Sequence, residues 1–127
     1  VKGRGLIERA GAILFAGSLV SEAALRWASA GCAIADSKNM TLEQMSAWLI
    51  EHAARCDTVV RLQTGDPGLY GALIELVQPL DAADVAIQVV PGVSSAMASA
   101  AAAVESLTLP EVTQTVIFTR VEGRTPM

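Results

Sequence analysis

The sequence predicts an α/β fold in which a parallel sheet carries helices on both faces. Of its 127 residues, 52% are apolar, which is enough to bury a core within one domain. Short apolar or β-branched runs alternate with segments whose apolar residues recur every three to four positions, and Gly or Pro separates them. This alternation is typical of parallel strands joined by right-handed helical crossovers. We therefore expect a single α/β domain over residues 1–127.

The first third of the chain contains two predicted helices and two predicted strands. Residues 1–10 show helical spacing, and the apolar run 12–15 that follows is bounded by glycines, as a buried strand would be. A second helix is predicted over 20–30, because its apolar residues recur at helical spacing and Gly31 is a suitable stop. The apolar run 32–35 then predicts a second strand.

A third helix is predicted to begin after Thr41. Thr41 and Gln44 have the spacing of a capping box, in which each side chain bonds a backbone N–H of the other residue. Behind this cap, apolar residues recur on one face until the polar break near Asp57, namely Leu42, Met45, Leu49 and Ala53.

The next part of the chain repeats the order strand, loop, helix. Residues 58–62 are β-branched and apolar and predict a third strand. The loop 64–68, with the sequence Thr-Gly-Asp-Pro-Gly, interrupts it. Helical spacing resumes over 69–77 and is expected to end before Pro79.

The last part of the chain predicts two more strands around an Ala-rich helix. Residues 85–90 form a strand that Pro91 stops, and Ser94 or Ser95 then caps a helix reaching about Glu105. A final strand is predicted over 116–118.

Composition excludes several classes of protein. The net charge of −4 argues against a nucleic-acid partner, which normally requires a basic face. The longest apolar stretches, 11–20 and 96–104, are too short for a bilayer, so no membrane partner is expected. Cys32 and Cys56 form no disulfide framework, and a reducing cytoplasm is the simpler location. The chain opens with Val and without a signal sequence, so we expect a fragment or trimmed sequence.

The loops that follow the predicted strands are where a ligand is expected. In an open parallel sheet, ligands bind outside the carboxyl ends of the strands. Two of these loops, 64–68 and 91–95, place Gly and polar residues directly before a helix, which lets backbone approach a ligand. An ordinary turn with an Asp cap explains Gly65-Asp66-Pro67 equally well on composition alone.

Other kinds of site find little support. The spacing of Gly65 and Gly71 does not fit a Walker loop, and no G-x-G-x-x-G is present, so neither a nucleoside triphosphate nor a dinucleotide is indicated. His52 and Cys56 could share a helix face, but a closed zinc site needs about four ligands, so no metal is expected. One histidine and no G-x-S-x-G elbow leave no basis for a hydrolase triad.

Taken in order, the loop sequences resemble the tetrapyrrole (corrin/porphyrin) methylase family. The resemblance covers essentially the whole chain, and its general marks are Val-Lys-Gly at the start, Ala-Gly-Ser-Leu-Val at 16–20, Thr-Gly-Asp-Pro at 64–67 and Val-Pro-Gly-Val-Ser-Ser at 90–95. The run Thr-Gln-Thr-Val at 113–116, followed by Thr119-Arg120 and Gly-Arg-Thr-Pro at 123–126, is similar to the precorrin-4 C11-methyltransferase branch.

The resemblance implies a methyl transfer from the cofactor S-adenosylmethionine to a tetrapyrrole (precorrin) substrate. It implies a cofactor pocket formed by Thr64, Gly65, Asp66, Leu69, Ser94 and Ser95. In that pocket Asp66 would hold a ribose hydroxyl or the cationic end of the cofactor. Arg120 and Arg124 are the candidate partners of the substrate carboxylates, because a guanidinium fork suits them. No catalytic side chain is assigned, since a sulfonium methyl is already electrophilic and mainly needs alignment.

The resemblance also implies how the chain is organised. Residues 1–127 would be the incomplete N-terminal half of a two-domain methyltransferase, lacking the family's first strand and its second domain. A missing strand leaves backbone groups unpaired, so a homodimer or strand exchange is expected. Two alternatives remain open: another family activity, such as uroporphyrinogen-III or precorrin-2 methylation, and a binding module that catalyses nothing.

Overall fold

The computed structural model describes residues 2–17 and 19–119. Its chain divides into two compact units, Val1–Ser94 and Ser95–Met127, and each is described by itself. The first unit contains a sheet with helices, and the described part of the second, up to residue 119, contains one helix followed by an extended segment.

Three parallel strands form the sheet of the first unit: β1 (Ala12–Phe15), β2 (Ala33–Asp36) and β3 (Val59–Leu62). Their order is β2-β1-β3, with Ala12 opposite Ala33 on one side and opposite Val59 on the other. All four residues of β1 are buried, as expected for the central strand of a parallel sheet. The strands predicted over 12–15, 32–35 and 58–62 are therefore confirmed to within one residue at their ends.

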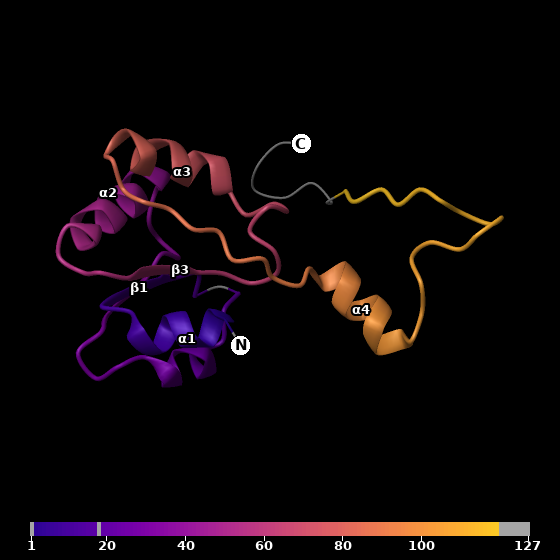
Figure 1. Cartoon of the computed structure of the whole chain (residues 1–127), viewed down its shortest axis with the longest axis horizontal. Helices are drawn as coiled ribbons and strands as arrows, with labels where there is room; N and C mark the ends of the chain where they lie inside the picture. Colours follow the sequence, from indigo (N-terminus) through magenta and orange to yellow (C-terminus); the bar gives the residue numbers. More distant parts are fainter. Residues whose placement is uncertain (1, 18, 120–127) are drawn as a thin grey trace. The chain divides into compact units, whose positions relative to one another are not determined.

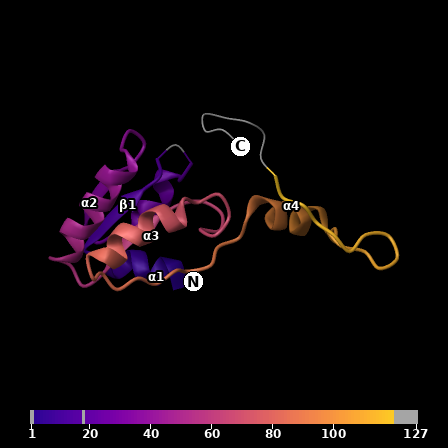
Figure 2. The same cartoon turned by 90° about the horizontal axis from the view of Figure 1, so that it is seen from above.

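Helices cover both faces of this sheet (Figures 1 and 2). On one face, Ile13 and Phe15 of β1 pack in a core with α1 (Lys2–Arg9) and η1 (Glu22–Trp27), which is a 3-10 helix. On the other face, Leu14 packs with residues of α2 (Leu42–Ala53) and α3 (Leu73–Ala82). Successive side chains of β1 thus point into different cores, and the predicted α/β class is confirmed.

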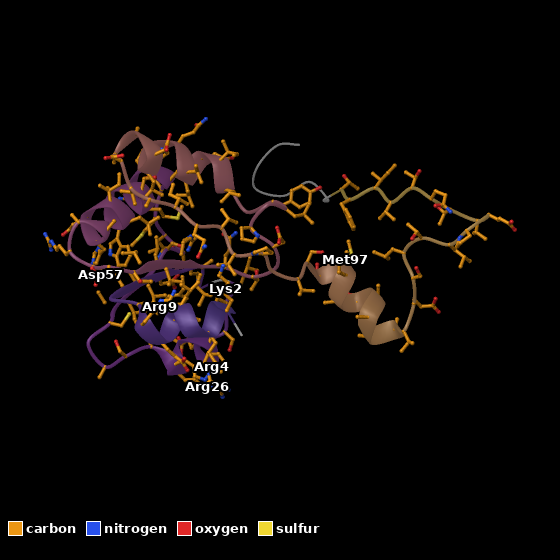
Figure 3. The ribbon with its side chains drawn as sticks, in the orientation of Figure 1. Lys2, Arg4, Arg9, Arg26, Asp57 and Met97 are labelled. Carbon is orange, nitrogen blue, oxygen red and sulfur yellow. The ribbon has the colours of Figure 1, made fainter. Side chains whose placement is uncertain are left out.

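Two arginines stack on the ring of Trp27, and one of these contacts joins α1 to η1. The guanidinium of Arg4 lies 5.2 Å from the centroid of the Trp27 ring, and that of Arg26 lies 4.5 Å from it. Figure 3 shows both arginines at the outer surface of these helices. Because arginine stacks favourably on an aromatic face, this contact helps hold η1 against α1.

The capping box predicted for the third helix is confirmed at the start of α2. The Thr41 hydroxyl accepts the Gln44 N–H at 3.2 Å, and the Gln44 side chain accepts the Thr41 N–H at 2.9 Å. Leu49 faces the core with 5% exposure. In the described ranges, no helix has both the length and the apolar character that a bilayer crossing requires.

Two helices differ from their predicted form. The segment expected to be a helix over 20–30 is the shorter 3-10 helix η1, whose backbone bonds join residues three apart, such as Ala28 N–H to Leu25 O. The helix expected over 69–77 begins instead at Leu73, because Tyr70 and Ala72 have φ angles of 57° and 50° and cannot be helical.

Pro79 does not end α3, contrary to the prediction, and the helix continues to Ala82. Leu76 and Leu80, on either side of this proline, are 6% and 9% exposed and belong to the core shared with α2. Their burial offsets the loss of one backbone hydrogen bond at the proline.

The strand predicted over 85–90 is wrong in this structure, as is the one over 116–118. Residues 85–94 are extended and have no ladder with β3, and residues 116–118 are not assigned to a strand. A strand is assigned by its partner, and an alternating apolar pattern does not supply one.

The second unit contains α4 (Ser95–Ala103) and an isolated antiparallel bridge between Leu109 and Thr113. The helix agrees with the prediction for this part of the chain and ends two residues earlier. None of its described residues is buried, and apolar side chains such as Val104 and Ile117 are 91% and 82% exposed.

Candidate functional site

The loop after β3 contacts residues 91–94 through the carboxylate of Asp66. The Oδ1 atom accepts the Gly68 N–H at 2.8 Å within the same loop. The Oδ2 atom accepts the Gly92 N–H at 2.9 Å. One side chain therefore uses both of its oxygens to hold two loops that are 26 residues apart in sequence.

Glycine is required where these two loops meet. A Cβ built on Gly92 would collide with the carbonyl oxygen of Gly65. Gly65 itself has a φ of +71°, which glycine adopts without strain, and a Cβ there would lie 3.9 Å from the Cα of Ser94. Of the residues predicted to bind the cofactor, the structure brings together Gly65, Asp66 and Ser94.

The other predicted site residues have different positions. Thr64 and Leu69 flank Asp66 with exposed side chains, and the Leu69 N–H donates to the Asp66 carbonyl at 3.1 Å. Ser95 is the first residue of α4 and belongs to the second unit. Arg120 and Arg124, predicted to bind the substrate, lie outside the described residues.

A second aspartate holds the loops that follow β1 and β2. The Oδ1 atom of Asp36 accepts two amides, from Gly17 and from Lys38, each at 2.9 Å. Beside it, Ser37 is buried and its hydroxyl donates to the Phe15 carbonyl at 3.1 Å. This Asp-Ser pair follows the apolar run 32–35 that was predicted to be a strand, and no role was predicted for it.

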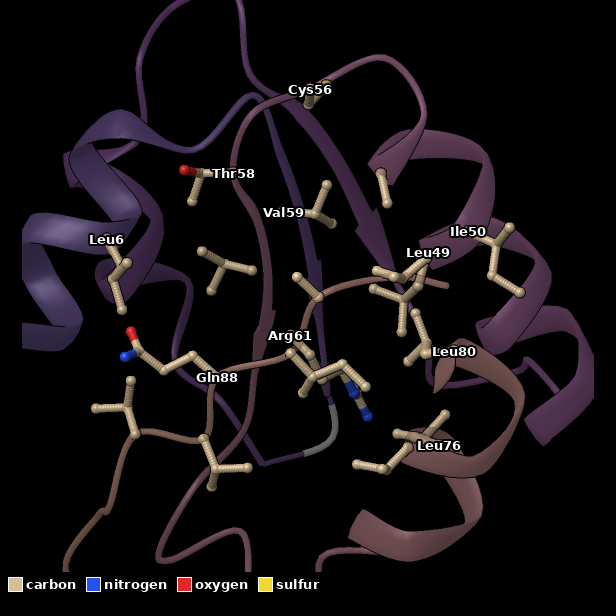
Figure 4. Close-up of a pocket in the computed structure, with 18 of the residues that line it drawn as sticks. Leu6, Leu49, Ile50, Cys56, Thr58, Val59, Arg61, Leu76, Leu80 and Gln88 are labelled. Atoms are coloured by element: carbon tan, nitrogen blue, oxygen red, sulfur yellow. The ribbon is translucent and has the colours of Figure 1, made fainter. Parts of the chain in front are cut away.

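A cavity of about 720 Å³ opens between β3 and the extended residues 85–90 (Figure 4). Helices α2 and α3 line one of its sides through Leu49, Leu76 and Leu80, and Leu6 of α1 lines another. Because residues 85–90 form no ladder with β3, this edge of the sheet is open to the cavity.

Arg61 also lines this cavity and was missed by the sequence analysis. Its Nη1 atom lies 3.4 Å from the Leu14 carbonyl, and its Nε atom is buried and has no hydrogen-bond partner among the residues that the structure describes. Burial lowers the pKa of the Arg61 guanidinium, and the nearby negative charge of Asp36 opposes this shift. The signal available in the sequence was one arginine inside the apolar run Val-Val-Arg-Leu.

His52, considered above together with Cys56 as a metal ligand, contacts Trp48 instead. The His52 ring stacks on Trp48 with 3.8 Å between centroids, and its Nδ1 lies 2.8 Å from the Trp48 carbonyl. Within residues 2–17 and 19–119, no group of three or more His, Cys, Asp or Glu is placed to hold a metal.

Comparison with known proteins gives related sequences across the whole chain. The family model for tetrapyrrole (corrin/porphyrin) methylases matches residues 1–126. Cobalt-precorrin-4 C11-methyltransferases from Methanocaldococcus jannaschii and Priestia megaterium are 45% and 43% identical over all 127 residues. The chain spans about half the length of these relatives, 49% of each.

Solved structures show the same relationship. The crystal structure of a cobalt-precorrin-4 methyltransferase matches all of this chain, with a TM-score of 0.91 and 43% identity, and the chain covers 53% of it. A uroporphyrin-III C-methyltransferase from Thermus thermophilus matches 91% of this chain and 45% of its own, with a TM-score of 0.72 and 30% identity. With its full-length family match and these relatives, the chain belongs to the tetrapyrrole (corrin/porphyrin) methylase family.

Proposed function

We propose that this chain is part of an enzyme that methylates precorrin-4 or cobalt-precorrin-4 at C11, with S-adenosylmethionine as cofactor, in cobalamin biosynthesis. The observation that carries the proposal is the identity with enzymes of that name, which extends over the full 127 residues. Related proteins with other tetrapyrrole substrates match a smaller share of the chain, as a siroheme synthase does over 65% of it.

The strand-end loops support a cofactor site of this kind. When bound, S-adenosylmethionine supplies an electrophilic sulfonium methyl to an electron-rich ring carbon. The chain itself would bind and orient the reactants, which is the main requirement of such a transfer. Gly65 and Gly68 leave the backbone of the loop open to a ligand, and the Asp66 carboxylate holds that loop beside Ser94. We propose Thr64, Gly65, Asp66, Leu69, Ser94 and Ser95 as the cofactor contacts.

Further parts of the proposal rest on the resemblance. Arg120 and Arg124 would bind substrate carboxylates, since an arginine fork matches the two oxygens of a carboxylate. Residues 1–127 would be the N-terminal half of a two-domain, cytoplasmic enzyme that forms a homodimer. In this proposal, the chain would contribute one part of the methylation site.

A second candidate function is methylation of another tetrapyrrole. It is favoured by the structural match to uroporphyrin-III C-methyltransferases, one of which was solved with S-adenosylhomocysteine. The higher identity to the precorrin-4 branch leads us to place this candidate second. A binding module without catalysis is the third reading, and only an activity measurement separates it from the other two.

Two measurements test the proposed function. Calorimetric titration with S-adenosylhomocysteine, on the 127-residue chain and on the complete polypeptide of its gene, should show saturable binding in the complete polypeptide and weaker binding in the chain. In the second measurement, the complete polypeptide is given methyl-labelled S-adenosylmethionine together with precorrin-4 or uroporphyrinogen III, and transfer of the label to each tetrapyrrole is measured.

Label in precorrin-4 alone supports the proposal, and label in uroporphyrinogen III alone replaces it with the second candidate. Saturable binding of S-adenosylhomocysteine without label in either tetrapyrrole would favour the binding module. The absence of S-adenosylhomocysteine binding to either protein would contradict a cofactor site in this chain.

A further inference from the structure

Arg61 is a partly buried cation whose hydrogen-bonding capacity is incompletely used. It lies in β3 on the face that packs against α2 and α3, next to an apolar cavity (Figure 4). Of its five N–H groups, the Nη1 group makes one contact, at the 3.4 Å limit of a hydrogen bond. Its Nε–H is fully buried and has no partner in the described part of the chain. A guanidinium is normally buried only when it is paired.

Among residues 2–17 and 19–119, no acidic side chain forms a salt bridge with this guanidinium. Asp36 exerts an electrostatic effect on Arg61, but its Oδ1 oxygen already accepts the amides of Gly17 and Lys38. Asp57 and Asp84 line the same cavity, but Asp57 lies before the start of β3, Asp84 lies in the turn after α3, and Arg61 is the third residue of β3. Neither forms a salt bridge with Arg61 among the described residues.

The surroundings of Arg61 would strengthen a bond to an incoming anion. Leu49, Leu76 and Leu80 make this side of the cavity apolar, and opposite charges attract more strongly in such a medium than in water. A carboxylate could accept from Nε–H and from an Nη group together, the paired geometry in which arginine binds carboxylates best. Such a ligand would also offset the cost of burying the cation.

We propose that Arg61 binds a carboxylate in the methylation site, and this inference rests on the proposed function. The carboxylate would belong to the cofactor or to the tetrapyrrole. Arg61 precedes Thr64, the first residue of the proposed cofactor loop, by only three positions. Its carboxylate ligand would therefore lie near the carboxyl edge of the sheet, where ligands of open parallel sheets bind. The proposed cofactor and the proposed substrate both carry carboxylates that Arg61 could bind, and the experiments below distinguish between them.

The first measurement follows the side chain directly. The Nε–H resonance of Arg61 is recorded by nitrogen-15 NMR in the 127-residue chain and assigned by its absence in Arg61→Met. Acetate, S-adenosylhomocysteine and uroporphyrin III are then added in turn. We expect at least one of them to shift this resonance in a saturable way. A resonance that none of the three moves would overturn the proposal.

The second measurement identifies the source of the carboxylate. S-adenosylhomocysteine is compared with 5′-methylthioadenosine, which lacks the amino-acid carboxylate. If the cofactor is the source, Arg61→Met lowers the affinity for S-adenosylhomocysteine about ten- to hundredfold and leaves that for methylthioadenosine within about twofold. If the tetrapyrrole is the source, the same loss appears for uroporphyrin III instead.

Two further variants serve as controls. Arg55→Met removes an exposed arginine just after α2, paired with Glu51 at 3.1 Å, and should change neither affinity. Arg61→Lys keeps the charge but loses the fork, so an intermediate affinity is expected. If Arg61 only supports the Leu14 carbonyl, Arg61→Met lowers the unfolding midpoint and all affinities remain alike, which overturns this inference.

The outcome also separates this inference from the proposed function. If Arg61→Met binds both S-adenosylhomocysteine and uroporphyrin III as tightly as the wild-type chain does, the inference is wrong and the proposed function is unaffected. Failure of the wild-type chain and of the complete polypeptide to bind either ligand defeats both.

Discussion

Asp36 and Asp66 perform similar tasks at two places on the sheet and use their oxygens differently. Each accepts an amide two residues ahead in its own loop, from Lys38 or from Gly68. Each also accepts the amide of a glycine in a distant loop. Asp36 makes both bonds through Oδ1, whereas Asp66 divides them between Oδ1 and Oδ2.

This difference determines which aspartate an asparagine could replace. An asparagine side chain has one acceptor oxygen and one NH₂ donor. At position 36 the single oxygen can keep both amides. At position 66 one of the two amides would face an NH₂ group, so one hydrogen bond is lost and two donors oppose each other. The same residue type in the same kind of loop is therefore replaceable in one case and required in the other.

The two glycines whose N–H groups donate to these aspartates also differ in how well they could be replaced: Gly17 should tolerate a larger residue better than Gly92. A Cβ on Gly17 would meet the Asp36 carboxylate, which is the end of a side chain and can turn away. A Cβ on Gly92 would meet the backbone carbonyl of Gly65, which cannot move without its loop. Residues 91–94 also have no strand partner among the described residues. The position of these residues therefore depends more on the contact with Asp66 than the position of the loop after β1 depends on Asp36.

The largest effect is expected for Gly92→Ala. The added methyl group overlaps the Gly65 carbonyl and should separate the two loops, breaking the Gly92 to Asp66 bond. We expect the free energy of unfolding to fall by about 3 kcal/mol, at the upper end of overpacking costs, as measured by urea denaturation. Gly31→Ala is the matched control, because a Cβ there meets nothing within 4 Å. Equal stability of the two variants would mean that the loops do not touch in solution.

Asp66→Asn should have the next largest effect, a loss of about 2 kcal/mol, because a hydrogen bond to a charged carboxylate is broken and an NH₂ donor is set against a backbone N–H. Affinity for S-adenosylhomocysteine in the complete polypeptide should fall as well, since the position of residues 91–94 depends on this carboxylate. Asp57→Asn, at an exposed position, controls for the change of charge. Unchanged stability together with unchanged affinity would show that Asp66 is a dispensable turn residue.

Gly17→Ala should cost less, about 1 kcal/mol, because the Asp36 side chain can rotate and lose one hydrogen bond without moving backbone. Thermal unfolding followed by circular dichroism compares it with Gly92→Ala under the same conditions. A larger loss for Gly17→Ala than for Gly92→Ala would reverse the proposed order of the two contacts.

Asp36→Asn is expected to have the smallest effect, about 0.5 kcal/mol, since one amide oxygen can keep both hydrogen bonds. Urea denaturation of the four variants places them on one scale. If Asp36→Asn is as damaging as Asp66→Asn, then the charge of Asp36, which also acts on Arg61, matters more than its hydrogen-bond geometry.

Features decided within a few residues were predictable from the sequence alone. The capping box of Thr41 and Gln44 specifies the start of α2, because both partners lie in one turn. The runs that became β1, β2 and β3 are apolar over four residues each and alternate with helices, and this order implies a parallel sheet. The loop around Asp66 was identified because ligand sites of such sheets lie at strand ends.

Features that depend on a distant partner were decided only by the tertiary structure. Residues 85–90 have a strand-like sequence but no ladder, because a strand needs a neighbour at hydrogen-bonding distance. Pro79 remains inside α3 because Leu76 and Leu80 are buried against α2, a gain that local propensity does not contain.

The candidate site shows the same division between sequence and tertiary structure. Its loop, and Asp66 within it, were found from the sequence, but the bond from Asp66 to Gly92 spans 26 residues and was not. Arg61 was not singled out within the predicted strand 58–62, and only the packing of α2 and α3 over β3 shows that its Nε–H is buried and has no partner in the described part of the chain. The sequence determined which residues stand at the strand ends, whereas tertiary packing determined which of their polar groups are satisfied, because hydrogen-bond partners and desolvation depend on neighbours far away along the chain.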